Sequence, residues 1–224
     1  MIRAQILWAD LQTRKETKMY RDNREYRNMP MVEIRKEDSN ESSFLVEGYA
    51  TNYNEYVLFT DENGTEYKEK ILPEAFDGTD FSDVVFLKDH QGTVFARTKN
   101  NTLSLEVNEN GLFTRTDLSK TSASREMFEE IQTGMYSQMS FAFIVDDDEY
   151  NTKEHLLTIR HIAKLFDVSA VSFPANPTTE ISVATRSRFD GFIEQEKAER
   201  LAREHEIEVA RAKYNYIKEK NHGN

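Results

Sequence analysis

The feature that most constrains the fold is a succession of short apolar runs with strand character, which extends from about residue 31 to residue 173. Several of these runs alternate apolar and polar residues, which is typical of half-buried strands. Asn63-Gly64 and Asn110-Gly111 favour the left-handed backbone that tight hairpin turns need. The expected strands are residues 32–35, 44–50, 56–60, 66–71, 84–87, 94–97, 103–107, 112–118, 139–145, 156–162 and 165–173, with a turn at 146–149. The pattern therefore predicts a domain built mainly of strands.

One helix is expected to interrupt this series. Ser122 or Ser124 can cap its N-terminus, and Gly134 is a plausible residue at which to end it. Met127 and Ile131 lie four residues apart, so they would share one apolar face of the helix. The helix would thus pack on the strands and lead into the strand at 139–145.

The two ends of the chain differ from the middle in composition. Residues 1–30 are polar, with closely spaced Arg and Lys, and are expected to form a helical or disordered arm. Residues 31–185 would form the folded domain. Residues 186–224 are predicted to form one long charged helix, supported by pairs such as Glu196 with Arg200. About 35 residues would reach about 50 Å, so this tail would either project or pack on a partner.

Charge and composition exclude several classes of partner. The net charge is −11, and the acidic excess lies within residues 31–185. Without clustered Lys and Arg, nucleic acid is not an expected partner, whereas a basic protein segment would suit the charge. No run of eighteen apolar residues occurs, so no membrane partner is expected. The apolar stretch before Asp10 is too short for a secretory signal. The chain has no cysteine, which excludes a disulfide framework, a thiolate zinc site and a cysteine nucleophile.

Three polar residues in or beside apolar runs are candidate catalytic groups. Ser140 lies inside the run 139–145, His90 follows the run 84–87, and Asp167 interrupts the run 165–173. A hydroxyl, an imidazole and a carboxylate are the set that a serine hydrolase requires. A buried carboxylate is costly unless it is paired, so Asp167 is expected to have a partner, and a histidine would serve.

Each candidate also has a structural alternative. Ser140 could bond only to backbone, His90 could be an ordinary surface residue, and Asp167 could face water on an edge strand. Ser137 is a rival nucleophile, although it lies in the expected turn, where serine commonly bonds locally. Strict alternation would place Asp167 on the same face of its strand as Leu165.

Five segments in order resemble motifs of the prohead (capsid maturation) serine proteases of tailed bacteriophages, which are related to the herpesvirus assemblins. The segment from Gly134 to Phe143 resembles that family's G-x-x-x-G-M-S-F-G-F, and the segment from Asp167 to Pro177 resembles E-V-S-x-V-T-x-P-A-N-P. Residues 47–50, 71–76 and 87–90 resemble its x-G-Y-A, I-x-P-G-A-F and catalytic-histidine segments. The resemblance covers roughly residues 31–180.

The sequence departs from the family pattern at three positions. Gln138 and Ala142 stand where the family has glycines, which is expected to alter loop packing rather than remove the nucleophile. Asp167 stands where the family more often has Glu, and it is one methylene shorter. His161 is therefore an alternative third member, because assemblins use a second histidine in that role. Asp167 is the preferred member because it occupies the matching motif position.

The resemblance implies a fold, an activity and partners. The fold would be α+β, with a mainly antiparallel β-barrel core, surrounding helices and the long C-terminal helix. The activity would be that of a serine endopeptidase, with Ser140 as nucleophile, His90 as general base and then acid, Asp167 as the orienting acid, and neither cofactor nor metal. Its site of action would be the procapsid in the host bacterial cytoplasm.

The implied substrates are the scaffolding segment of the major capsid protein and the protease itself, with self-association left open. Backbone N–H groups or an arginine would stabilise the oxyanion. The competing hypothesis is a non-enzymatic capsid assembly or scaffolding factor. A small-ester hydrolase is disfavoured, because the chain has no Gly-x-Ser-x-Gly elbow.

Overall fold

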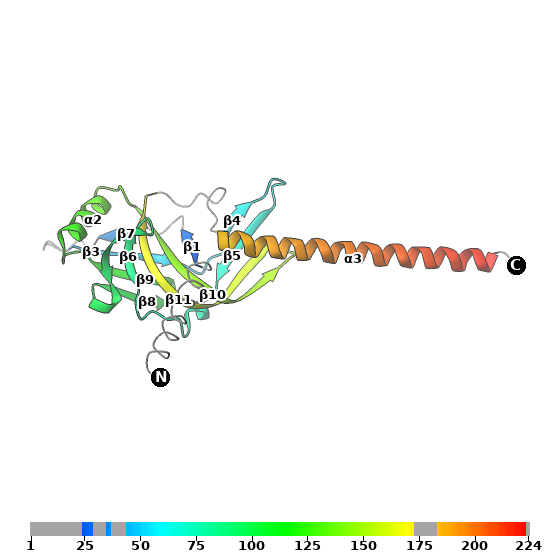
Figure 1. Cartoon of the computed structure of the whole chain (residues 1–224), viewed down its shortest axis with the longest axis horizontal. Helices are drawn as coiled ribbons and strands as arrows, with labels where there is room; N and C mark the ends of the chain where they lie inside the picture. Colours follow the sequence, from blue (N-terminus) through cyan, green and yellow to red (C-terminus); the bar gives the residue numbers. More distant parts are fainter. Residues whose placement is uncertain (1–23, 29–34, 37–43, 173–182, 223–224) are drawn as a thin grey trace, which may run out of the picture. The chain divides into compact units, whose positions relative to one another are not determined.

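A computed structural model describes residues 24–28, 35–36, 44–172 and 183–222 (Figure 1). The chain divides into two compact units, Met1–Ala184 and Thr185–Asn224. The strands are β1 (Glu25–Asn28), β2 (Arg35–Lys36), β3 (Leu45–Thr51), β4 (Tyr56–Thr60), β5 (Glu66–Ile71), β6 (Val85–Lys88), β7 (Gln91–Arg97), β8 (Leu103–Asn108), β9 (Gly111–Asp117), β10 (Gln138–Asn151) and β11 (Leu156–Val171). The helices are α2 (Ser122–Gln132) and α3 (Val183–His222), with 3-10 turns at Pro73–Phe76 and Thr98–Asn100.

The strands of the first unit form two sheets. One has seven strands, in the order β1-β10-β11-β5-β4, with β6 also paired to β11 and β7 paired to β6. The other has the order β2-β3-β9-β8. The pairings of β11 with β5 and with β6 are parallel, and the other described pairings are antiparallel. The predicted α+β class, with mostly strands and a long C-terminal helix, is confirmed. The described pairings do not close a barrel, so a barrel core is not confirmed.

The central strands β10 and β11 pair with each other along almost their whole length, from Gln138 opposite Val171 to Asn151 opposite Leu156. Phe141, Phe143, Leu165 and Val168 from these strands are fully buried. Burying such a side chain stabilises the fold by about 1.5–3 kcal/mol. Met127 of α2 is also buried, so the apolar face predicted for that helix meets the core. These two paired strands carry Ser140 and Asp167, two residues of the candidate site.

The N-terminal region differs from the expectation of a helical or disordered arm. Residues 25–28 form β1, which pairs antiparallel with β10 and places Asn28 opposite Ser140 and Glu25 opposite Phe143. A polar strand of four residues gives little local signal. It forms because the edge of β10 offers it backbone partners and because its side chains find ion-pair partners on the sheet.

Two further expectations are corrected by strand pairing. Residues 146–149 do not form a turn but lie inside β10, and the two strands expected between residues 156 and 173 are one strand, β11. Pairing along the whole length of β10 and β11 outweighs the local turn propensity of the acidic run. The cap of α2 is Thr121, whose side chain accepts a hydrogen bond from the backbone N–H of Ser124. Residues 32–34 and both Pro174 and Pro177 lie outside the described residues.

The described residues of the second unit all lie in the helix α3. Arg203 lies 3.9 Å from Glu199, as the sequence predicts, whereas Arg200 lies 4.0 Å from Glu204. Several large apolar side chains on it are exposed: Leu201, Ile207, Val209, Tyr214, Tyr216 and Ile217. None of the helices in the described part of the chain is long and apolar enough to cross a membrane.

Candidate active site

His90 lies at the tip of the hairpin that joins β6 and β7. Lys88 pairs with Gln91, so the loop between them contains only Asp89 and His90. Both loop residues have positive φ angles, 47° and 57°. Type I′ hairpin turns require this conformation, which is strained for residues other than glycine and is often found at functional sites. The backbone N–H of Asp89 donates to the carbonyl of Ala170, 3.0 Å away, which fixes the tip against β11.

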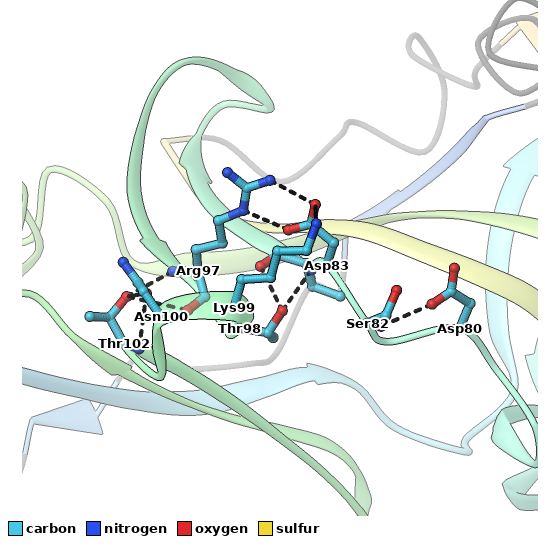
Figure 2. Close-up of polar contacts among 9 residues, drawn as sticks. Asp80, Ser82, Asp83, Arg97, Thr98, Lys99, Asn100 and Thr102 are labelled. Atoms are coloured by element: carbon cyan, nitrogen blue, oxygen red, sulfur yellow. Dashed lines mark hydrogen bonds and ion pairs between the residues drawn. The ribbon is translucent and has the colours of Figure 1, made fainter. Parts of the chain in front are cut away.

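The base of the same hairpin is held by a polar cluster (Figure 2). The guanidinium of Arg97 binds both carboxylate oxygens of Asp83, at 2.5 and 2.7 Å, and Lys99 contacts the second oxygen at 2.8 Å. Hydrogen bonds from Arg97 and Lys99 lower the pKa of the Asp83 carboxyl well below its ordinary value. Asp83 precedes β6 and Arg97 ends β7, so the cluster ties together the two strands that carry His90.

Ser140 lies near the start of β10 and is fully buried. Its Oγ lies 2.6 Å from Nε2 of His90, and it also donates a hydrogen bond to the backbone carbonyl of Arg27, 2.8 Å away. A hydroxyl has a single hydrogen, so it can donate to one of these two acceptors at a time. When it donates to His90, the arrangement is that of a nucleophile and its base.

Asp167 reaches the site because β11 is irregular beside it. Asp167 pairs with Ala142, while Leu165, two residues earlier, pairs with the next residue of β10, Phe143. Phe166 is therefore an extra residue in β11, between the two residues that pair with Ala142 and Phe143. Strict alternation would have put Leu165 and Asp167 on one face of the strand, but the shift puts them on opposite faces. Bulges commonly redirect side chains beside active sites. Here the shift places Asp167 on the face of Ala142 and Ser140, where His90 also lies.

The carboxylate of Asp167 has two side-chain partners. Its Oδ1 lies 2.6 Å from Nδ1 of His90 and accepts a hydrogen bond of 2.8 Å from the hydroxyl of Ser169. The side chain of Asp167 is 2% exposed and that of His90 is 15% exposed. In the tautomer that carries its proton on Nδ1, His90 donates to the carboxylate of Asp167, and Nε2 can accept from Ser140. The three residues singled out in the sequence are thus connected in one hydrogen-bonded chain.

The strand β1 lies over the hydrogen-bonded residues Ser140, His90 and Asp167. The ring of Tyr26 packs against the imidazole of His90, and the guanidinium of Arg27 binds both carboxylate oxygens of Glu69, at 2.5 and 2.6 Å. Burial opposes the charge of Arg27, but attraction to Glu69 and Glu25 outweighs it and raises the pKa of the guanidinium well above its ordinary value. Burial, together with Glu69, also raises the pKa of the Tyr56 phenol, which hydrogen-bonds Glu69.

Sequence reasoning missed several of these neighbours. It assigned no role to Tyr26 and Arg27, or to Glu69 and Ser169. The only local signal was the polar Ser169 beside Asp167 in an apolar run. The others are brought together by pairing between strands distant in sequence, so no pattern within one segment could have identified them.

The rival residues lie elsewhere. Ser137 is exposed in the loop before β10. Both ring nitrogens of His161 are engaged away from His90, with the carboxylate of Asp146 and with the carbonyl of Asp77 at 3.0 Å. His90 therefore contacts Asp167, and His161 forms a separate pair. Within the described ranges, no group of three or more His, Asp or Glu side chains is arranged to hold a metal ion.

Comparison with known proteins agrees with the resemblance noted in the sequence. The family model of the caudovirus prohead serine proteases matches residues 31–191. No curated protein and no solved structure matches the chain.

Proposed function

Because the chain belongs to the caudovirus prohead serine protease family, we propose that it cleaves the scaffolding segment of the major capsid protein, and itself, inside the procapsid. The family assigns it serine peptidase chemistry and a part in capsid maturation. The residues that perform the chemistry, the substrates and the place of action are our proposal. The observation that carries it is the position of His90 between the other two residues. Its Nδ1 lies 2.6 Å from Oδ1 of Asp167, and its Nε2 lies 2.6 Å from Oγ of Ser140.

The proposed reaction uses these three residues in sequence. Ser140 Oγ attacks the carbonyl carbon of the scissile peptide bond while its proton passes to Nε2 of His90. His90 then returns the proton to the leaving amine as the C–N bond breaks, which leaves an acyl group on Ser140. A water molecule, deprotonated by His90, hydrolyses this ester and restores the hydroxyl. Asp167 keeps Nε2 directed at Ser140 and stabilises the imidazolium that forms transiently.

The competing function is a capsid assembly factor without catalytic activity. An assembly factor would use the acidic surface and α3. It would not need a hydroxyl, an imidazole and a carboxylate that are hydrogen-bonded to one another. The connected arrangement of Ser140, His90 and Asp167 therefore favours the peptidase.

Co-expression with the cognate capsid protein tests the proposal. The chain should shorten the capsid protein, whereas Ser140→Ala should leave it intact when the products are read by mass spectrometry. Ser137→Ala is the matched control, because Ser137 is an exposed serine three residues away, and it should cleave normally. Equal, full-length products from the wild type and Ser140→Ala would favour the assembly factor.

We also propose that residues 186–224 form a separate region that delivers the protease to the assembling shell. The support is that α3 belongs to a compact unit of its own and exposes six large apolar side chains along a charged helix. Deleting residues 186–224 should abolish packaging into procapsids while the truncated chain still cleaves capsid protein in solution. Normal packaging of the truncated chain would overturn this assignment.

The relation to assemblins adds a proposal about the fold. We expect the two sheets to be parts of an assemblin-like barrel, since Thr114 of β9 contacts Met139 of β10, which belongs to the other sheet. A crystal structure in which the sheets do not curve around one core would reject this expectation.

A further inference from the structure

An extended segment of the chain itself, β1, occupies the edge of β10 next to Ser140. β1 pairs antiparallel with β10 from Glu25 to Asn28. Adding a strand to a sheet edge is a common way to hold a peptide, because backbone hydrogen bonds provide affinity and side-chain pockets provide selectivity. An endopeptidase must hold its substrate extended beside the nucleophile, so β1 shows where that substrate would lie.

The register of β1 places one of its peptide bonds beside Ser140. The carbonyl oxygen of Arg27 lies 2.8 Å from Ser140 Oγ, and this carbonyl belongs to the Arg27–Asn28 peptide bond. Asn28 is the residue paired with Ser140. The carbonyl is thus within reach of the hydroxyl, although it accepts the hydroxyl hydrogen in this arrangement. If that hydrogen turns to Nε2 of His90, which lies 2.6 Å from Ser140 Oγ, the imidazole can take the proton as the oxygen attacks the carbonyl carbon.

The side chain of Arg27 occupies a pocket that requires a cation. Glu69, on β5, is fully buried and binds the guanidinium in a two-pronged contact. The ring of Phe143 lies 5.3 Å from the guanidinium carbon, which adds a cation–π contact. A buried carboxylate left without a positive partner is strongly disfavoured. The pocket therefore favours a basic residue at the position of Arg27, which is the residue whose carbonyl oxygen contacts Ser140.

The residue of β1 that precedes Arg27 also has a defined neighbour. Tyr26 packs against His90 with ring centroids 4.7 Å apart. Because side chains alternate along a strand, Tyr26 points to the face of the site and Arg27 to the face of Glu69. An aromatic residue before the basic one would shield the imidazole from water during the reaction.

We propose, on the premise that the chain is the peptidase described above, that it cleaves after a basic residue, that Glu69 determines this specificity, and that Arg27–Asn28 is its first substrate. Ser140 attacks the Arg27 carbonyl, His90 passes the proton to the Asn28 nitrogen, and water releases residues 1–27 with a free carboxylate on Arg27. Until this occurs β1 fills the groove, so cleavage of other chains follows self-cleavage.

Incubation of the purified full chain tests the bond directly. Intact mass and N-terminal sequencing should reveal a product that begins at Asn28, and Ser140→Ala should yield none. Arg27→Lys keeps the charge and should be processed at the same bond. Arg27→Gln should slow that cleavage at least about 100-fold, because the buried carboxylate of Glu69 then lacks its positively charged partner.

The processed wild-type enzyme provides a test that does not depend on folding of a variant. A peptide with the sequence of residues 22–33 should be cleaved between Arg27 and Asn28, at least about 100-fold faster than the same peptide with Gln in place of Arg27. Glu69→Gln should reduce this ratio to within about tenfold.

The possible outcomes distinguish the peptidase function from the proposed specificity and self-cleavage site. Cleavage of capsid protein that depends on Ser140, but without basic residues before the cut bonds, would overturn the specificity and leave the peptidase standing. A new N-terminus other than Asn28 would overturn the self-cleavage site. The absence of any cleavage that depends on Ser140 would overturn both the peptidase and this inference.

Discussion

The ring of Tyr26 meets the imidazole of His90 edge to face, with the centroids 4.7 Å apart and the ring planes inclined by 69°. Tyr26 belongs to β1, so the contact joins a four-residue strand to the hairpin tip that positions the proposed general base. Together with the hydrogen bond from Ser140 to the Arg27 carbonyl, this contact holds β1 over Ser140, the proposed nucleophile, which is fully buried. Access to Ser140 therefore depends on how readily β1 leaves the edge of β10.

Tyr26→Ala should make Ser140 more accessible. An aromatic contact contributes about 0.5–1.5 kcal/mol, so a small fluorophosphonate should label Ser140 up to about tenfold faster. Labelling rates followed by mass spectrometry measure this effect. Tyr214→Ala, which alters an exposed tyrosine of α3, should not change the rate. An unchanged rate in Tyr26→Ala would mean that the Tyr26–His90 contact does not limit opening.

Asp167→Asn should abolish most activity while the protein remains folded. The amide can offer its N–H to Nδ1 of His90, which would leave the imidazole in the wrong tautomer to accept the proton of Ser140. The expected loss in kcat is about 10³–10⁴-fold. Cleavage rates together with a thermal melt distinguish this from unfolding. Retention of more than about a tenth of the activity would exclude Asp167 as the orienting acid.

Ser169→Ala should lower kcat without changing KM. Ser169 donates to the same oxygen of Asp167 that contacts His90, at 2.8 Å. A hydrogen bond to a charged group contributes about 1.5–3 kcal/mol, so a loss of about tenfold in kcat is expected from a less well oriented Asp167. Ser172→Ala is the control, because the Ser172 side chain lies near Asp89 instead. Equal effects of the two variants would argue against an orienting role for Ser169.

The pKa of His161 should lie above its ordinary value of 6.5. The hydrogen bond and charge of Asp146 raise it, with a further contribution from the Asp77 carbonyl. Since this pKa is raised on folding, the protonated pair stabilises the protein fully below pH 6.5 and less as the pH rises through the folded-state pKa. NMR titration measures the value, and Asp146→Asn should lower it. Because His161 is separate from the site, His161→Gln should retain peptidase activity.

The carboxyl groups of Asp80 and Asp83, near the base of the His90 hairpin, should make the stability of the fold decrease at low pH. Hydrogen bonds from Lys164 and Ser82 lower the pKa of Asp80 to about 2, and the pKa of Asp83 is also depressed. Both groups therefore stabilise the fold above about pH 4, and this contribution is lost as the pH falls through their folded-state pKa values. The urea midpoint of wild type should fall more between pH 5 and pH 2.5 than that of Asp80→Asn/Asp83→Asn. Parallel declines would show that other groups dominate.

Much of the fold could be predicted where the signal is local. The hairpin of residues 56–60 and 66–71 agrees with β4 and β5, because alternating residues around an Asn-Gly turn specify both strands and their connection. The helix ending before Gly134 was predicted for a similar reason, since Gly134 adopts a φ of +82° that favours glycine. The turn expected at 146–149 was wrong, because pairing with β11 extends β10 through that acidic run.

The sequence by itself determined the strand-rich class, the long C-terminal helix, the family, and Ser140, His90 and Asp167 as candidates, because residue type and short-range periodicity carry that information. Only the tertiary structure decided that the bulge at Phe166 directs Asp167 to His90, and that β1 lies on β10 with Arg27 bound to Glu69, 42 positions away. These contacts depend on register between distant strands. Register is set by packing of the whole sheet, which no local pattern encodes.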